Sequence, residues 1–572
     1  MNTPSDVTDK QACGSELPPL RSPDEVMTLD RLGASFPHRL SFMRSFIRNI
    51  AAQKVQITSP SSELDQNGFG HLVLSLKLSG YDYSLIAFSR PLDDADRTDR
   101  VIATKWDASF CLFDGIPSQT DIDTLSDEVT RQEAGRYHDK VLTLSRANKS
   151  VRLFQHVIDE LSDGRQPDWQ AIISTGYLMR TTAVYGNGKF GIADRAQIES
   201  REGLGGPFQV EMLTVYLIRE FTLYLADFCA AQKGGDRAVR LEPARRRYLG
   251  IGNSTGLGMA PFLVTHPVLL NSWIMAREVA LARVRAIPRA HHDDIIRFGT
   301  LLNRAHQHCR EWVVDDKIQM QRIETLRTEL EGLKAGLIAS PLREDFPFEE
   351  AFCRTSECSH ETQELMASVL IELFPDIVDG LADCMATPVQ PRLFPSMTLS
   401  GLSDILSEHY GWVDGVDVQS RTSDAQFWYT SEDKLEPRMG SRYDEPGAER
   451  EMPFNIAAYV NRLRADMQEA DDALSVAEFL MRFPQHRFII RRVQTTARFP
   501  YAEIRDNLVG ADCRAVDLLR CKLSFFGASK FDPKSDKWTR ITLYQGAPTA
   551  ADLASDTAER LDDWAFARHQ AG

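Results

Sequence analysis

Two glycine-rich segments restrict the backbone of this chain more than any other feature, and they flank a stretch that otherwise has the pattern of helices. The first is TTAVYGNGKFG at residues 181–191, and the second is GIGNSTGLGMAP at residues 250–261. Ordering a glycine costs more backbone entropy than ordering any other residue. The density of glycine in residues 250–258 therefore indicates unusual dihedral angles or a close approach of the backbone to another group, most simply a ligand.

The first segment has the composition of an anion-binding loop. Its glycines are closely spaced, so successive backbone N–H groups can converge on an anion, and Lys189 and Tyr185 are candidates for acid–base chemistry. It is no P-loop, because Phe190 follows Lys189 where that motif needs Ser or Thr. The alternative is a tight interhelical loop whose aromatic side chains pack in the core. The predicted ligand contacts are Arg180, Asn187 and Gly188.

The second segment carries hydrogen-bonding side chains and is expected to be a loop that enters a helix. Unpaired N–H groups and the helix dipole make such a start favourable for an anion. Pro267 suits the first turn of the next helix, and His266 before it is a candidate general base, with a satisfied core histidine as the alternative. The predicted ligand contacts are Asn253, Ser254 and Thr255.

The densest basic cluster of the chain leads into this second segment and comprises Arg237, Arg240, Arg245, Arg246 and Arg247. We predict that Arg246 contacts an anionic ligand. The alternative is a solvated arginine face that balances acidic neighbours.

The apolar stretch 211–231 is predicted to be a core helix, although it contains Glu220 and Asp227. Carboxylates within a buried helix need a partner or a function. Because the two residues are seven apart, they share a helix face. We expect the arginine cluster or Lys189 to pair with them in a structural salt bridge, and the alternative is a functional role.

A third constellation lies at residues 427–442, where aromatic residues lead into densely charged ones. Loops that leave a strand in this way often carry functional residues. Glu432 and Lys434 are predicted to contact the substrate, and Arg438 is predicted to clamp a carboxylate. A solvated charged loop is the alternative.

A short heptad seam is visible in residues 323–337, formed by Ile323, Leu326, Leu330, Leu333 and Leu337. Two heptads are too few for a true coiled coil. The first interpretation is a helical hairpin that packs on its own chain, and the second is a contact between two copies, which would make the protein a homo-oligomer.

Composition and charge exclude several classes of protein. The 572 residues are 43% hydrophobic and 26% charged, with a net charge of −15 that disfavours nucleic acid as a partner. The nine cysteines are scattered, with no CxxC pair, so we expect free thiols and no metal site. The most apolar run contains three charged residues, which argues against a membrane partner, and no signal peptide is apparent. The cytoplasm is the predicted compartment.

These patterns predict a multidomain protein that is mainly α, with an N-terminal antiparallel β patch and an α+β C-terminal region. The predicted parts are a flexible N-terminal arm at 1–30, an α+β domain with a small antiparallel sheet at 31–164, a helical core domain with glycine-rich loops at 165–387, and an α+β domain at 388–572.

The functional hypothesis is an enzyme that binds a small carboxylate or phosphate through the glycine-rich segments and arginines. Acid–base chemistry of the lyase or isomerase kind is expected, because no motif for a redox cofactor or a metal is visible, and no cofactor can be named. The alternatives are a non-catalytic ligand-sensing or scaffolding protein and a nucleotide-dependent enzyme. The hypothesis requires that both glycine-rich segments meet in space.

Overall fold

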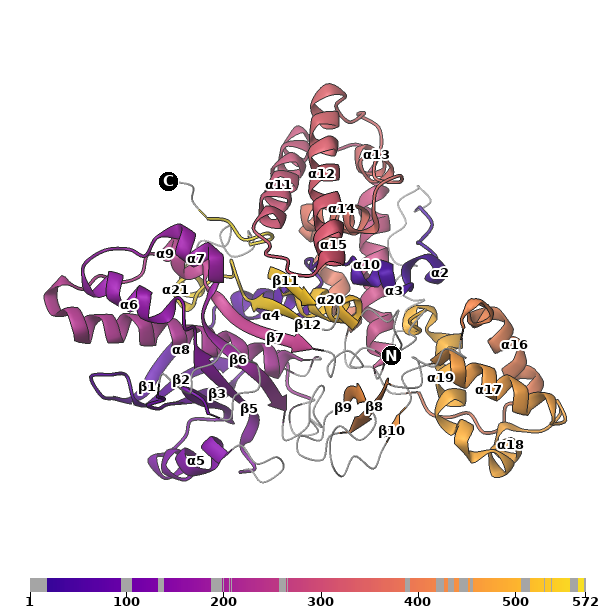
Figure 1. The fold of residues 1–572 in the computed structure, drawn as a ribbon, viewed down its shortest axis with the longest axis horizontal. Coiled ribbons are helices and arrows are strands. Elements are labelled where there is room, and N and C mark those ends of the chain that lie inside the picture. Colours follow the sequence, from indigo (N-terminus) through magenta and orange to yellow (C-terminus); the bar gives the residue numbers. More distant parts are fainter. Residues whose placement is uncertain are drawn as a thin grey trace.

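A computed structural model gives the fold of this chain, in which helices predominate around one large sheet (Figure 1). The prediction of a mainly α fold with an N-terminal antiparallel β patch and an α+β C-terminal region is confirmed. The described residues are 18–93, 105–131, 138–186, 198, 200–204, 206, 208–256, 264, 266–385, 391–417, 426–430, 437–441, 451–452, 456–505, 515–528, 530–535, 538–555 and 564–569.

The helices are α2 (Pro23–Val26), α3 (Leu29–Gly33), α4 (Phe42–Ala52), α5 (Gln119–Arg131), α6 (Phe154–Ser162), α7 (Trp169–Thr175), α8 (Gln209–Gly234), α9 (Pro243–Tyr248), α10 (Pro267–Arg285), α11 (His292–Arg310), α12 (Lys317–Ala339), α13 (Pro347–Cys353), α14 (His360–Leu373), α15 (Pro375–Val378), α16 (Leu399–His409), α17 (Ile456–Gln468), α18 (Val476–Arg482), α19 (Arg487–Arg498), α20 (Ala515–Phe526) and α21 (Ala550–Ala554). The strands are β1 (Ile57–Leu64), β2 (Gly70–Leu78), β3 (Tyr81–Ser89), β4 (Ala108–Asp114), β5 (Val141–Lys149), β6 (Tyr177–Gly186), β7 (Gly250–Gly256), β8 (Gln426–Thr430), β9 (Pro437–Ser441), β10 (Glu451–Met452), β11 (Lys530–Ser535) and β12 (Trp538–Leu543).

The main sheet has nine strands in the order β1-β2-β3-β4-β5-β6-β7-β12-β11, and β8, β9 and β10 form a separate sheet of three. Strands β1 to β6 form an antiparallel meander, β7 runs parallel to β6, and β12 is antiparallel to β7. The sequence therefore predicted too few strands for this sheet. The sheet also takes in strands from the stretch predicted to be helical and from the C-terminal region.

Alternating side chains of β2 reach two different cores, as the period of two in a strand requires. Leu72, Leu74 and Leu76 belong to the main core, which α8 shares, whereas Val73 belongs to a smaller cluster with residues of α5. Helix α8 is apolar on nearly all sides and packs against several strands of the sheet, so the prediction of a core helix at 211–231 is confirmed.

The N-terminal segment from residue 18 onward is packed against the body of the protein. Val26 and Met27 are fully buried, and Tyr501 donates a hydrogen bond from its hydroxyl to the carbonyl of Arg21 at 2.6 Å. Residues 18–30 of the predicted arm are thus packed on the protein, and residues 1–17 lie outside the described residues. The main core is one cluster of buried side chains whose members range from Val26 to Ala567. The predicted domain boundaries stay predictions.

The heptad seam lies on α12 and faces the same chain. Ile323, Leu326 and Leu330 are buried, and α12 packs against α11 and α14. These contacts favour the intramolecular hairpin over a contact between two copies. Within the described residues, no helix combines the length and the apolar character that crossing a membrane requires.

Candidate functional site

The two glycine-rich segments begin side by side in the main sheet. Strands β6 and β7 run parallel, with Tyr177 opposite Gly250 and Arg180 opposite Gly252. The side-chain amide of Asn253 donates a hydrogen bond to the Thr181 hydroxyl at 3.0 Å. The described parts of the segments thus lie side by side, and both strands end at the same edge of the sheet. That the segments enclose one pocket with Lys189 and His266 stays a prediction, because Lys189 lies outside the described residues.

The second segment begins as a strand, and the prediction of a loop from Gly250 is wrong for β7. A side chain at Gly252 would place its Cβ 2.6 Å from the Tyr177 ring, and one at Gly250 would meet the Leu543 carbonyl oxygen at 2.2 Å. The close approach that these two glycines permit is therefore to neighbouring strands rather than to a ligand. Sequence reasoning missed this because the partners lie far away in the chain.

Gly252→Ala is expected to lower the free energy of unfolding by about 1–3 kcal/mol, because the new methyl group overpacks the Tyr177 ring. Urea unfolding followed by circular dichroism measures the change. The matched control is Gly332→Ala in α12, where the added Cβ meets nothing within 4 Å and should stabilise the helix by about 0.5–1 kcal/mol. Equal effects of the two substitutions would refute this account of Gly252.

Polar side chains occupy the sheet beside the β6–β7 pair. Thr181 is buried on β6, and nearer the carboxyl end of that strand the hydroxyls of Thr143 on β5 and Thr214 on α8 lie 2.7 Å apart. Arg180 is 7% exposed and lies opposite Asn148 on β5. A guanidinium, an amide and hydroxyl groups thus lie along β5 and β6, which are adjacent and antiparallel.

The chain at Val264, beyond the second segment, is anchored by the C-terminal region. Arg492 on α19 donates from Nη1 to the Val264 carbonyl at 2.5 Å and pairs with Glu503 at 2.7 Å. The Tyr410 hydroxyl donates to the same carboxylate at 2.9 Å. Burial opposes the charge of Arg492, but Glu503 outweighs this and raises the pKa of Arg492 above its usual value. This buried group fixes the position of Val264 ahead of α10.

His266 is the N-cap residue of α10, and Pro267 occupies the first turn as predicted. The His266 side chain is half-buried. His266 follows the anchored Val264 by two residues. Its role as a general base stays a prediction.

The arginine cluster is engaged within the chain, as the structural alternative expects. The Arg246 guanidinium contacts the Asp227 carboxylate, whose other oxygen accepts a hydrogen bond from the Leu241 amide at 3.1 Å. Arg245 pairs with Glu242. The expected pairing with the arginine cluster is confirmed for Asp227 and favours a structural role for Arg246, whereas Glu220 lies 3.8 Å from Arg219, its neighbour in sequence.

Several predicted site residues lie outside the described side chains. Tyr185 lies in β6, Ser254 and Thr255 in β7, and Arg438 in β9, where the structure gives only their backbone. Four of the predicted contacts and one catalytic candidate lie outside the described residues altogether: Asn187, Gly188, Glu432, Lys434 and Lys189.

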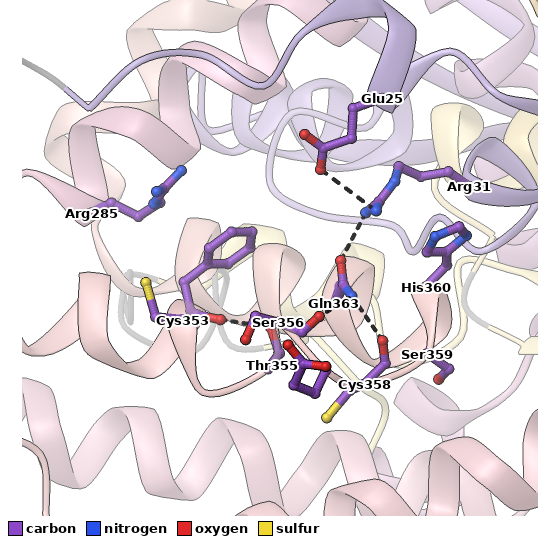
Figure 2. A pocket seen from close by; sticks show the side chains of 12 residues that line it. Glu25, Arg31, Arg285, Cys353, Thr355, Ser356, Cys358, Ser359, His360 and Gln363 are labelled. Atoms are coloured by element: carbon purple, nitrogen blue, oxygen red, sulfur yellow. Dashed lines mark hydrogen bonds and ion pairs between the residues drawn. The ribbon is translucent and has the colours of Figure 1, made fainter.

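A pocket of about 700 Å³ opens between the N-terminal helices and the turn from α13 to α14 (Figure 2). Its two arginines have carboxylate partners in the chain. Arg31 lies 3.5 Å from Glu25, and Arg285 lies 2.6 Å from Glu349. The start of α14 is likewise occupied, because Glu329 accepts hydrogen bonds from the backbone and side chain of its N-cap residue. These pairings give the pocket a structural explanation.

The described side chains contain no group of three or more His, Cys, Asp or Glu residues that could hold a metal ion. A function for this chain has to be derived from its own residues and their geometry. No protein family model, no curated protein and no solved structure matches it.

Proposed function

We propose that the chain is a cytoplasmic enzyme that binds a small carboxylate or phosphate where β6 and β7 end, and that it carries out acid–base chemistry of the lyase or isomerase kind. The observation that carries the proposal is the parallel pairing of the two strands that lead into the glycine-rich segments. Ligands of sheets with parallel strands bind outside the carboxyl ends of those strands.

The geometry supplies what an anion site at this edge needs. Two glycine-rich segments leave adjacent strands at one edge, so their backbone N–H groups can converge on a common ligand. Arg180 and Asn253 lie in the strands behind the edge, and Arg492 anchors the chain at Val264, beyond the second segment. In the proposal, Lys189, Tyr185 and His266 exchange protons with the ligand.

Two alternatives have distinct consequences. In a non-catalytic ligand-sensing protein, Lys189→Ala and His266→Ala would leave function intact, whereas substitutions in the 323–337 seam would abolish it. In a nucleotide-dependent enzyme, ATP or NADP⁺ would stabilise the fold and Arg246→Ala would remove the effect.

The test is a thermal-shift screen with inorganic phosphate, succinate, ATP and NADP⁺. A bound ligand at about 100 times its Kd stabilises the fold by about 2.7 kcal/mol, so phosphate or succinate should raise the Tm by about 2 °C or more. Lys189→Ala should lower this shift, and Arg289→Ala should retain it in full because Arg289 is 80% exposed and far from the strands in sequence. The proposal fails if Lys189→Ala leaves the shift unchanged or if neither phosphate nor succinate stabilises the protein.

A further inference from the structure

A polar pocket of about 660 Å³ lies between α11 and α12 and is separate from the β6–β7 edge. Tyr248, which donates a hydrogen bond to Glu311 of this pocket, stands just before β7, at the opposite end of that strand from Gly256. The side chains that matter for its chemistry are His306, Arg310, Glu311, Glu331, Lys334 and His569.

The chain after α21 brings His569 to this pocket. Arg304 on α11 donates from Nη2 to the Ala565 carbonyl at 2.5 Å and to the Phe566 carbonyl at 3.3 Å. The Arg44 guanidinium lies 4.7 Å from the ring centroid of Trp564. Residues 564–569 are therefore held on α11 by specific contacts, and His569 has a fixed place.

His569 lies beside a carboxylate that is itself fixed. Nδ1 of His569 lies 3.0 Å from Oε1 of Glu311 but makes no hydrogen bond, and the Tyr248 hydroxyl donates to Oε2 of Glu311 at 2.7 Å. Burial, and then the neighbouring Glu311, raise the pKa of Tyr248 far above its usual value, so its hydroxyl stays a donor. The negative charge of Glu311 beside Nδ1 favours the tautomer with its proton on that nitrogen and the lone pair on Nε2.

The ring of His569 is also confined by aromatic neighbours. Trp169 lies 6.0 Å from it and Tyr248 lies 6.2 Å from it, measured between ring centroids. With a side-chain exposure of 17%, His569 is mostly enclosed but still borders the pocket. The neighbouring carboxylate and the two aromatic rings limit the positions that the His569 ring can take.

The rest of the lining supplies two cations for an anion. Lys334 Nζ lies 3.2 Å from Nδ1 of His306, and burial followed by the charge of Lys334 lowers the pKa of His306. Arg310 is the second cation. The lining also carries two carboxylates: Glu331 is 64% exposed and lies 3.5 Å from Nε2 of His306, and Glu311 accepts a hydrogen bond from Tyr248.

We propose that this pocket binds a small molecule bearing carboxylate or phosphate groups, with Arg310 and Lys334 binding the anion and His569 Nε2 facing the ligand as an acid–base group. A proton taken from the ligand resides on Nε2, and Glu311 stabilises the imidazolium that forms. The site goes beyond the proposed function, because it uses elements that do not belong to the β6–β7 edge.

The binding test is isothermal titration calorimetry of the full chain with inorganic phosphate and with succinate. Lys334→Ala and Arg310→Ala are each expected to raise the Kd at least about tenfold, because each removes a charged hydrogen-bond donor. Lys317→Ala is the matched control, because it removes an exposed cation from the first turn of α12, far from Lys334, and it should keep the Kd within about twofold. No binding of either probe, or equal binding by wild type and Lys334→Ala, would overturn the site.

A second measurement separates this pocket from the β6–β7 edge and tests the orientation of His569. Nitrogen-15 NMR of the free protein should assign to His569 a neutral tautomer with its proton on Nδ1, and Glu311→Gln should weaken that preference. Assignment of the proton to Nε2 would contradict the acid–base role. Lys189→Ala changes only the β6–β7 edge. If Lys189→Ala keeps its affinity for phosphate or succinate and Lys334→Ala loses it, the result supports this pocket. If Lys189→Ala loses the affinity and Lys334→Ala keeps it, the pocket is refuted.

Discussion

Arg219→Met is expected to lower the free energy of unfolding by about 3–5 kcal/mol, the range for removal of one partner from a buried charged group. Arg219 is 1% exposed in the middle of α8. Its guanidinium donates to five backbone carbonyls: Leu249 at 2.8 Å, Ala547 at 2.9 Å, Arg247 at 3.0 Å, Pro548 at 3.0 Å and Arg246 at 3.1 Å. Methionine fills similar volume but leaves buried acceptors unsatisfied, at about 1–3 kcal/mol for each acceptor that water does not reach.

The position of Arg219 explains why the loss should be large. Its carbonyl partners lie at the end of α9, just before β7, and in the turn after β12, so one side chain joins the core helix to two neighbouring strands of the sheet. A cation is also favourable at the carboxyl end of a helix, where α9 presents its last carbonyls.

Urea unfolding monitored by tryptophan fluorescence tests Arg219→Met. The control is Arg289→Met, whose side chain is 80% exposed and lies 3.5 Å from Asp345, and which should change stability by less than about 1 kcal/mol. Arg219→Lys keeps the charge but cannot reach all five carbonyls, so its stability should fall between the two. If Arg219→Met were no less stable than Arg289→Met, the hydrogen bonds from Arg219 to the five carbonyls would not stabilise the fold.

Local pattern predicted those elements whose side chains meet neighbours close in the chain. The alternation at residues 71–78, the mostly apolar run at 83–88 and the continuous apolar character of α8 were sufficient to place a sheet and a core helix. Strand β7 was not predictable in the same way, because GIGNSTG has no alternation and its glycines are required by Tyr177 and Leu543. Its strand character comes from partners in β6 and β12.

The candidate sites show the same limit. The sequence predicted that Asp227 would pair with the arginine cluster, because a buried carboxylate needs a partner and the cluster follows in the chain. The sequence could not predict that His569 lies beside Glu311 or that Arg492 donates to the Val264 carbonyl, since no spacing pattern connects residues so far apart. Such contacts exist only once α11 and α19 are in place.

Glu364→Gln is expected to lower the free energy of unfolding at pH 7 by about 3–5 kcal/mol, because it removes the negative charge from a buried cluster of arginines. Glu364 on α14 is 1% exposed, and its carboxylate lies 2.6 Å from Arg21, 3.1 Å from Arg31 and 3.3 Å from Arg277. Glu278 is the second carboxylate of this cluster and lies 2.8 Å from Arg21. The substitution leaves the arginines with one carboxylate.

The contribution of Glu364 should disappear in acid. Burial alone would raise the pKa of Glu364, but Arg21 and Arg277 outweigh burial and hold this pKa well below its usual range. The unfolded chain, in which a Glu pKa is about 4.3, therefore binds protons more readily than the folded chain. The stabilisation is complete above that pH and is lost as the pH falls toward the folded-state pKa, so the gap between wild type and Glu364→Gln should narrow below about pH 4.3.

Urea unfolding at several pH values between 7 and 3 measures this gap. Glu408→Gln is the control, because Glu408 is 75% exposed on α16 and should change stability little at any pH. A gap that stays constant with pH would show that the lost stability comes from packing rather than from charge. Arg21 and Arg31 belong to the N-terminal segment, so amide hydrogen exchange should also become faster in residues 18–33 of Glu364→Gln and not elsewhere. Such a change would show that the ion pairs of this cluster hold the segment on α10 and α14.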